Sequence, residues 1–235
     1  MSAFFKNFSS YKHVVIDEAQ DYNDFTFYVL KKILSKSSFS IYGDIAQSIY
    51  SYRSLDNWDS IKKYIFKNAE IKNLNKSYRT TIEIMNEANK INKHLNLLQA
   101  DAVIRHGDKV LYEKIKQNSD IILLLQNLIK KENHNIAIIT KNSKQAIELN
   151  TFLKDVFDIK CITDKVQEYS DGICIMPCYL CKGLEFDGVI IYDASNINYD
   201  EDNILDMKLL YVAMTRALHN LVITYKQKLP LNLDI

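Results

Sequence analysis

Apolar and polar positions alternate along this chain with two different periods. Short apolar runs, several of them rich in β-branched residues, predict strands at residues 13–16, 38–42, 70–74, 135–140, 173–176, 188–192 and 221–225. Between many of them, apolar residues recur every three to four positions, which predicts amphipathic helices. Strands that alternate with helices favour an α/β fold, with a parallel sheet covered by helices on both faces.

Polar residues mark where several of these helices begin. Asn23 or Asp24 can cap a helix that follows residues 13–21, and Thr80 with Glu83 fits a capping box. Further helices are expected at 57–66, 120–131 and 206–219. The residues expected on one face of their helix are Phe25, Val29 and Ile33; Ile84, Met85, Ala88 and Ile91; and Ala146, Leu149, Leu153 and Val156.

Three carboxylates follow the first apolar run. The strand predicted at 13–16 ends at Asp17 and Glu18, with Gln20 and Asp21 directly after them. In open parallel sheets, ligands bind outside the carboxyl ends of the strands. One carboxylate there can hold Mg²⁺ while its neighbour orients a water for attack on a phosphate. The alternative is an acidic surface turn.

A second informative stretch, GDIAQSIYSYR, covers residues 43–53 and also begins at a predicted strand end. Gln47 offers an amide that could sense a phosphate or its attacking water. Tyr50, Tyr52 and Arg53 offer flat rings and a guanidinium for stacking on bases. The alternative is a turn whose tyrosines fill a core.

Composition narrows the class of protein. The 235 residues are 47% hydrophobic, enough for one large or two small globular domains. Thirty basic and 29 acidic residues give a net charge of +1, so any nucleic-acid contact must be local. No apolar run is long enough to indicate a membrane span or a signal peptide.

Cys174, Cys178 and Cys181 are clustered, but neither a paired CxxC nor a nearby histidine completes a metal site. Reduced, buried thiols in a cytoplasmic protein are therefore expected, with no membrane partner. Trp58 and His219 receive no role.

Five stretches together carry a family resemblance. They are DEAQD at 17–21, GDIAQSIYSYR at 43–53, NKSYRT at 75–80, CKGLEFD at 181–187 and LLYVAMTRA at 209–217. Their order resembles motifs II to VI of superfamily 1 helicases of the UvrD/Rep/PcrA type, which implies a RecA-like parallel sheet of the P-loop NTPase type. Residues 177–187 lack the Thr-x-His of the main group and resemble the HelD or helicase IV-like branch.

The resemblance implies roles for individual residues in ATP hydrolysis. Asp17 would coordinate Mg²⁺, and Glu18 would be the general base. Gln47 would couple the γ-phosphate of ATP to bound nucleic acid. Arg79 and Arg216 would supply positive charge at the γ-phosphate, as arginine fingers do. Either arginine could instead form a surface ion pair.

Further roles concern the ribose and the nucleic acid. The resemblance implies that Glu185 hydrogen-bonds the ribose and that Gly183 lets the backbone approach the nucleotide. Tyr50, Tyr52 and Arg53 would contact single-stranded DNA, with Tyr52 where the family often has a base-stacking tryptophan. Glu185 could instead be plain loop surface.

No stretch reads G-x-x-x-x-G-K-[ST], and the five glycines cannot form a phosphate-cradling loop. The chain therefore resembles the C-terminal portion of such a helicase, without its N-terminal P-loop half. Residues 1–70 are expected to be the C-terminal part of the first RecA-like domain, with motifs II and III. Residues 71–235 are expected to be the second domain, with motifs IV to VI.

Two functional hypotheses remain. In the first, the chain is part of an ATP- and Mg²⁺-dependent helicase or translocase on single-stranded DNA, inactive as an ATPase by itself because the Walker A loop is missing. In the second, it is a natural truncation that binds nucleic acid or RNA polymerase without hydrolysis.

Overall fold

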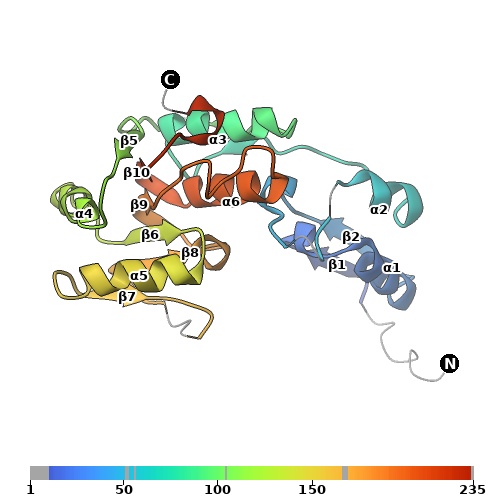
Figure 1. Cartoon of the computed structure of the whole chain (residues 1–235). Coiled ribbons are helices and arrows are strands. Elements are labelled where there is room, and N and C mark those ends of the chain that lie inside the picture. Colours follow the sequence, from blue (N-terminus) through green and yellow to red (C-terminus); the bar gives the residue numbers. More distant parts are fainter. Residues whose placement is uncertain (1–10, 51–52, 56, 104, 166–168, 234–235) are drawn as a thin grey trace. The chain divides into compact units, whose positions relative to one another are not determined.

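The computed structural model describes residues 11–50, 53–55, 57–103, 105–165 and 169–233 (Figure 1). The chain divides into two compact units, Met1–Leu74 and Asn75–Ile235. Each unit has its own cluster of buried apolar side chains. No helix of the described residues is long and apolar enough to cross a membrane.

The first unit is built on two parallel strands that pair in register from His13 with Ser38 to Ile16 with Ile41. Its elements are β1 (His13–Ile16), the short helix η1 (Ala19–Asp21), α1 (Asp24–Ile33), β2 (Ser38–Ile41), the short helix η2 (Ile45–Gln47) and α2 (Asp59–Tyr64). Its buried core consists of Ala19, Phe27, Leu55 and Ile61. The strands predicted at 13–16 and 38–42 and the helices predicted after residue 21 and at 57–66 are confirmed, with bounds that differ by a few residues.

Two details of the first unit were predicted wrongly. Phe25 is 71% exposed, whereas Phe27 is buried and packs edge-on against Tyr22 and Phe66. Helix α1 therefore turns a different face to the core. Strand β1 is also less buried than its apolar sequence suggests, since Val15 is 63% exposed. Among the described residues β1 pairs only with β2, and this small sheet leaves the Val15 side chain uncovered.

The second unit contains a six-stranded, all-parallel sheet in the order β5-β10-β9-β6-β8-β7. The strands are β5 (Leu111–Lys114), β6 (Ile136–Thr140), β7 (Ile159–Cys161), β8 (Ile173–Pro177), β9 (Phe186–Ile191) and β10 (Ala217–Tyr225). A separate two-stranded pair joins β3 (Lys76–Ser77) to β4 (Asp101–Ala102). The short helices η3 (Cys178–Leu180) and η4 (Pro230–Asn232) lie in connections.

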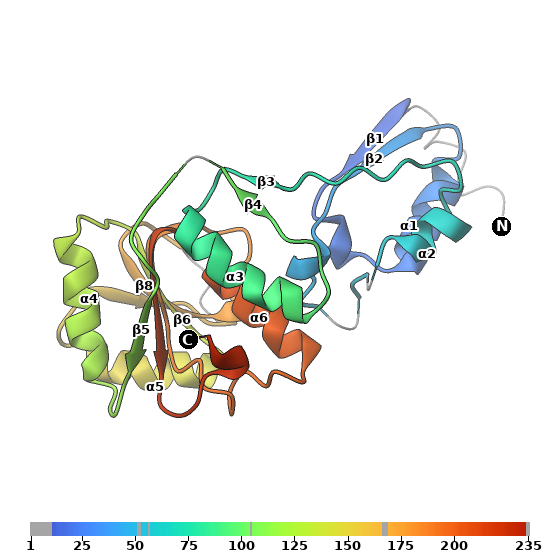
Figure 2. The same ribbon diagram turned by 90° about the horizontal axis from the view of Figure 1, so that it is seen from above.

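Four helices cover this sheet. Helices α4 (Asp120–Lys130) and α5 (Ser143–Leu153) pack on one face, and α3 (Ile82–His94) and α6 (Ile204–Met214) lie on the other (Figure 2). Strand β6, in the middle of the sheet, is buried along its whole length. The predicted α/β architecture, a parallel sheet covered on both faces, is confirmed.

Several local predictions for residues 70 onward were wrong. Residues 70–74 form no strand and are exposed, because their apolar residues alternate with Glu70, Lys72 and Asn73 and meet no partner strand among the described residues. Strands β5 and β7 were not predicted. Val156 lies beyond the end of α5 and is exposed, so it does not share the buried face of that helix.

The beginning of α3 and the end of α6 also differ from the prediction. Thr81, not Thr80, caps α3, with its Oγ1 accepting from the backbone N–H of Ile84. Helix α6 ends at Met214, so Arg216 lies in the turn before β10 and not on a helix. Strand β10 begins at Ala217 and leaves no room for a longer helix.

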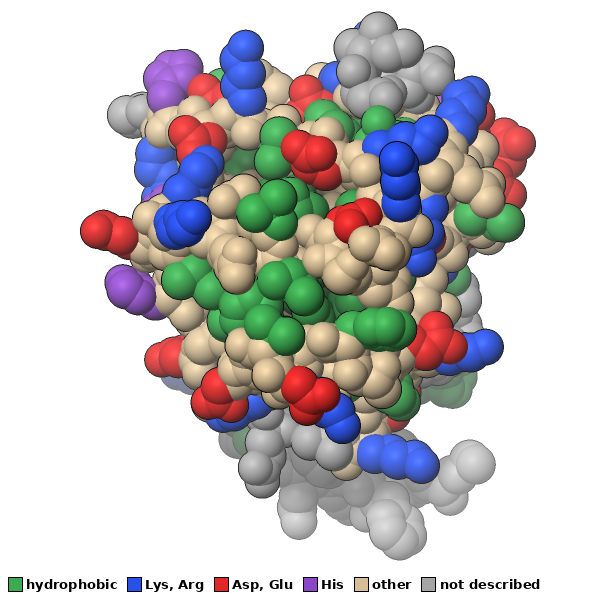
Figure 3. All heavy atoms as spheres, turned by 60° about the vertical axis from the view of Figure 1, so that its left-hand side comes forward, with side chains coloured by type: hydrophobic (Ala, Val, Ile, Leu, Met, Phe, Trp, Pro, Cys, Tyr) green, Lys and Arg blue, Asp and Glu red, His purple; other side chains and the backbone are tan. Residues whose placement is uncertain are grey.

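Apolar side chains also reach the surface. One face of the molecule shows hydrophobic side chains gathered in its middle, with charged side chains around them (Figure 3). In the second unit, exposed apolar residues on α4 and α5 include Leu123, Ile147 and Phe152. Nothing in the described residues covers these three side chains.

Candidate functional site

The first unit carries adjacent carboxylates directly after β1. Asp17 and Glu18 are both exposed, and Glu18 has a left-handed backbone, with φ of 50°. The backbone N–H of Glu18 donates to Oδ1 of Asp17 at 2.9 Å. Oε2 of Glu18 accepts from Nε2 of Gln20 at 2.5 Å. The strand end therefore presents two carboxylates to solvent, one of them oriented by a neighbouring amide.

Gln20 connects this strand end to the next one. It is fully buried, and its Oε1 accepts from the backbone N–H of Asp44 at 3.0 Å. Its own carbonyl oxygen accepts from the N–H of Leu55 at 2.9 Å. Gly43 permits this approach, because a Cβ there would lie 2.5 Å from Oε1 of Gln20. The ends of β1 and β2 are thus held together through one amide side chain.

Asp44 continues the connection to Gln47. As the N-cap of η2, its Oδ1 accepts from the backbone N–H of Ala46 at 2.9 Å. Its Oδ2 accepts from Nε2 of Gln47 at 2.9 Å. Side-chain and backbone hydrogen bonds therefore run from Glu18 through Gln20 and Asp44 to Gln47.

The residues proposed to contact nucleic acid lie just beyond this network. The guanidinium carbon of Arg53 lies 4.3 Å from the ring centroid of Tyr50, a cation–π contact. Arg53 also lines a hollow of about 240 Å³ together with Glu18, Asp21, Tyr22 and Thr26. Tyr52 lies outside the described residues.

In the second unit, Arg79 and Glu185 form an ion pair, with Nε of Arg79 2.6 Å from Oε1 of Glu185. Their side chains are 48% and 39% exposed, so both are accessible to a ligand. Gly183 nearby in sequence has φ of 81°, a conformation that favours glycine, and its surroundings are open. These three residues come from the turn after β3 and from the connection between β8 and β9.

Arg216 is buried, with 1% of its surface exposed. Its Nε and Nη1 donate to the carbonyl oxygens of Val212 and Leu184 at 3.2 and 3.3 Å, and Nη2 donates to Oγ1 of Thr215 at 3.3 Å. Burial lowers the pKa of this guanidinium, and the charge of Arg79 lowers it further. Arg216 therefore lies inside the unit, whereas Arg79 lies at its surface.

The structure thus distributes the predicted residues over the two units. Asp17, Glu18, Gln47, Tyr50 and Arg53 belong to the first, and Arg79, Gly183, Glu185 and Arg216 belong to the second. Gln20, Gly43 and Asp44 were not predicted to have individual roles, although all three lie inside the two motifs. The signal that could have identified them is an amide and a glycine shortly after apolar strands.

The donor chemistry at Asp17 fits a magnesium ion. Its carboxylate is exposed at a strand end beside a second carboxylate, and Mg²⁺ is usually held by one or two carboxylates together with waters and phosphates. The cysteines offer no comparable site. Burial raises the pKa of the Cys174 thiol to about 12, and no group of three metal-binding side chains occurs among the described residues.

Two family models match the chain. Residues 5–59 match the UvrD/REP helicase N-terminal domain, and residues 172–224 match the UvrD-like helicase C-terminal domain. The candidate ATP-dependent DNA helicase R568 of Acanthamoeba polyphaga mimivirus is 27% identical over 92% of this chain and 34% of its own length. The ATP-dependent DNA helicase PcrA of Staphylococcus epidermidis is 27% identical over 62% of this chain and 22% of its own length.

Two solved structures are similar as well. The C-terminal domain of a possible DNA helicase from Lactobacillus plantarum WCFS1 has a TM-score of 0.54 and 27% identity, covering 67% of this chain and 92% of that one. The PRRSV helicase has a TM-score of 0.50 and 15% identity, covering 92% of this chain and 35% of that one, and shows the fold alone.

The chain spans about a third or less of the length of these two curated relatives. The matches support a UvrD-like superfamily 1 helicase and a RecA-like fold, in agreement with the resemblance of the motifs. The assignment to the HelD-like branch stays a prediction.

Proposed function

We propose that this chain supplies motifs II to VI of an ATP-dependent DNA helicase that couples ATP hydrolysis to movement on single-stranded DNA. Residues 1–70 would belong to the first RecA-like domain and residues 71–235 would form the second. The observation that carries the proposal is the hydrogen-bond connection from Glu18 through Gln20 and Asp44 to Gln47. It joins the expected general base to the residue expected to couple the γ-phosphate to bound nucleic acid.

Glu18 would accept a proton from the attacking water. The side-chain Nε2 of Gln20 donates to one oxygen of this carboxylate and so fixes its orientation. Asp17 would hold Mg²⁺, which when bound neutralises charge on the phosphates of ATP. A shift of Gln47 against Asp44 would reach Glu18 through two further hydrogen-bonded groups, which is a physical route for coupling hydrolysis to nucleic-acid binding.

Arg79 would bind the γ-phosphate from the second domain. Glu185 holds its Nε, while the two terminal amino groups of the guanidinium form no hydrogen bond among the described residues. Those two groups can donate to phosphate oxygens in the forked geometry that arginine provides. Arg216, fixed in its buried position, would contribute positive potential, and Gly183 and Glu185 would lie along the nucleotide.

The DNA strand would contact Tyr50 and Arg53, where a ring and a guanidinium already stack on each other. Tyr52 would add a third contact. RNA polymerase is a second candidate partner, and it rests only on the resemblance of residues 177–187 to the HelD-like branch. As the 235 residues contain no Walker A loop, this chain by itself would not hydrolyse ATP.

The test measures binding of a fluorescent oligothymidylate to this chain, together with its ATPase rate with Mg²⁺ and DNA. We expect binding, little or no ATP turnover, and an affinity reduced ~5- to 100-fold in a Tyr50→Ala, Arg53→Ala double variant, since stacking is worth ~1–3 kcal/mol per base. The matched control is Lys63→Ala, Tyr64→Ala, which removes another cation–aromatic pair of the same unit.

Equal affinity in both double variants would show that Tyr50 and Arg53 do not contact DNA. Robust ATP turnover that Glu18→Gln abolishes would refute the expected inactivity of this chain. Binding to RNA polymerase without binding to DNA would favour the alternative, a non-hydrolytic module.

A further inference from the structure

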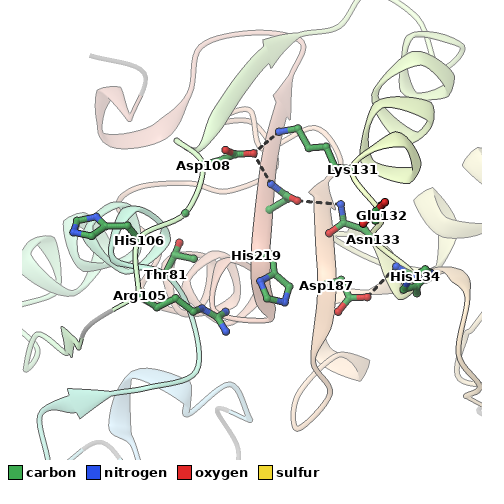
Figure 4. Close-up of a pocket in the computed structure, with 12 residues that line it drawn as sticks. Thr81, Arg105, His106, Asp108, Lys131, Glu132, Asn133, His134, Asp187 and His219 are labelled. Atoms are coloured by element: carbon green, nitrogen blue, oxygen red, sulfur yellow. Dashed lines mark hydrogen bonds and ion pairs between the residues drawn. The ribbon is translucent and has the colours of Figure 1, made fainter.

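The second unit contains a hollow whose lining includes one residue of the motif stretches, Asp187, but none of the residues with an expected role in ATP hydrolysis. It has a volume of about 730 Å³, within the range of small-molecule sites, and lies at the amino ends of β5, β10, β9 and β6 (Figure 4). Its walls come from the connections before these strands and from the strand ends themselves. The residues used below are Arg105, Asp108, Lys131, Asn133, Asp187 and His219.

On one side of the hollow, the polar side chains already form hydrogen bonds with one another. Asp108 accepts from Nζ of Lys131 at 2.5 Å and from Nδ2 of Asn220 at 3.1 Å. Oδ1 of Asn220 in turn accepts from Nδ2 of Asn133 at 3.0 Å. The hydrogen bond and charge of Lys131 lower the pKa of Asp108. The two side chains therefore form an ion pair that has no net charge.

Asp187 is also engaged. Its Oδ2 accepts from the backbone N–H groups of His134 and Asn135, each at 2.9 Å. These contacts fasten the connection before β6 to the beginning of β9. The carboxylates of Asp108 and Asp187 are therefore both bound by groups other than Arg105.

Arg105 is a cation without a counter-ion in the described part of the chain. Its Nη2 donates to the carbonyl oxygens of Arg79, at 3.2 Å, and Leu218. Its Nε is buried without a hydrogen-bond partner. Because a partly buried charge is costly unless it is paired, this guanidinium is a place where an anion would be stabilised.

His219 lies beside it. Its exposed ring on β10 forms no hydrogen bond or ion pair with the described residues, and Figure 4 shows it on the same side of the hollow as the Arg105 guanidinium. An imidazole N–H and the terminal amino groups of a guanidinium are both donors suited to phosphate oxygens.

We infer that Arg105 and His219 form a binding site for a phosphate group, carried either by a small phosphate or by a nucleic-acid strand. The site differs in its residues from the Arg79–Glu185 pair. It is nevertheless connected to that pair, because Arg105 donates to the carbonyl oxygen of Arg79. Occupancy could therefore influence the position of the Arg79 main chain.

Other charged groups around the hollow bear on this inference. His106 is paired with Glu83 at 2.9 Å, and His134 and Glu132 lie at the opposite wall. A metal ion is a poor alternative occupant, since no group of three metal-binding side chains occurs among the described residues. The unpaired donors on the Arg105 side favour an anion.

The test follows the histidine ring signals of the whole chain by NMR while inorganic phosphate is added. The His219 signals, identified by their loss in His219→Gln, should move in a saturable way. Because His219→Gln has no such signal, the affinity of each variant for inorganic phosphate is measured by isothermal titration calorimetry. His219→Gln should weaken binding roughly tenfold or more, and Arg105→Gln should abolish it, as expected for charge-assisted hydrogen bonds. Lys131→Gln is the control, because this cation lines the same hollow but is paired with Asp108. It leaves the Asp108 carboxylate uncompensated and should lower the affinity for phosphate, but by less than His219→Gln.

A parallel titration uses an oligothymidylate with and without saturating phosphate. Competition would identify a nucleic-acid strand as a source of the phosphate group, and its absence would identify small phosphates. Unmoved His219 signals in both titrations would overturn the inference, as would an equal loss of affinity in Lys131→Gln and His219→Gln. If Arg105→Gln does not fold, the comparison of phosphate affinity between His219→Gln and Lys131→Gln still tests the inference. Neither titration needs ATP hydrolysis, so failure here leaves the proposed function standing.

Discussion

Among single residues, Gly43 has the clearest steric role. A Cβ at this position would meet not only Oε1 of Gln20 but also its backbone nitrogen, at 3.0 Å, and the ring of Trp58, at 2.9 Å. Two of these neighbours belong to a residue whose amide is fully engaged. The small residue at the end of β2 is therefore what allows Gln20 to join the two strand ends.

The carboxylate of Glu83 makes stability depend on pH. A hydrogen bond with His106, at 2.9 Å, and one from the N–H of Gly107, at 2.8 Å, lower its pKa from 4.5 to about 2. As the folded-state pKa lies below the unfolded one, this contribution is present above about pH 5 and is lost as the pH falls toward 2. Glu83→Gln should therefore destabilise the protein at pH 6, and by less at pH 3.

Urea denaturation of both proteins across this range measures the difference. Glu132→Gln is the control, because Glu132 is an exposed carboxylate of the same unit without an ion pair among the described residues. A difference between wild type and Glu83→Gln that stays constant from pH 6 to pH 3 would show that the charge of Glu83 is not responsible.

Among the elements, helix α3 begins with two adjacent threonines whose hydroxyl groups differ in their hydrogen bonding. Oγ1 of Thr81 caps the helix, whereas Oγ1 of Thr80 is buried without a hydrogen-bond partner among the described residues. Thr81→Val should therefore lower the free energy of unfolding by about 1 kcal/mol, the usual value of an N-cap. Thr80→Val removes an unsatisfied polar atom and should be neutral or stabilising.

Thermal unfolding of the two variants gives this comparison directly, because both substitutions are isosteric and both sites are buried. Equal destabilisation would mean that Thr80 contributes to the cap, as its spacing from Glu83 in the sequence suggested. Glu83 is instead bonded to His106 and Gly107, which a capping-box pattern cannot reveal.

The elements also show what periodicity can and cannot predict. The inward face of α3, with Ile84, Met85, Ala88 and Ile91, follows from helical spacing and is confirmed. In α1, Phe25 and Phe27 are both apolar, and only the packing of Phe27 against Phe66 selects the buried one. The spacing of apolar residues predicts the buried face of a helix well when only one face is apolar. It predicts that face poorly when two faces carry apolar residues and tertiary contacts determine which of them is buried.

The candidate site was predictable for a similar reason. The sequence motifs predicted the strand ends that carry Asp17, Glu18 and Gln47, because acidic and amide residues follow apolar runs there. The hollow around Arg105 and His219 could not be predicted, since it is lined by the segments before β5 and β6 and by residues near the beginnings of β9 and β10, which are far apart in the sequence. Only the strand order β5-β10-β9-β6 brings these segments to one edge.

At the scale of the whole molecule, each unit has its own apolar core, and residues 67–75, between α2 and β3, contribute to neither. Residues 67–75 contain no helix or strand and are exposed throughout. Exposed chain without regular structure is where proteases cut first, whereas helical segments must open before cleavage. Limited digestion with trypsin should therefore cut after Lys67 or Lys72 in this segment, or after the exposed Lys76, the first residue of the two-residue strand β3 that follows it.

Mass spectrometry should then show a resistant product that begins at Asn68, Asn73 or Ser77 and contains the six-stranded sheet. Lys62 and Lys63 provide an internal control, because they are exposed but lie within α2 and should be cut later. A triple variant with Gln at the three expected sites should delay formation of the product. Early cleavage between β6 and β10 would contradict this expectation, since it would mean that the second unit is not a stable body once separated from the first.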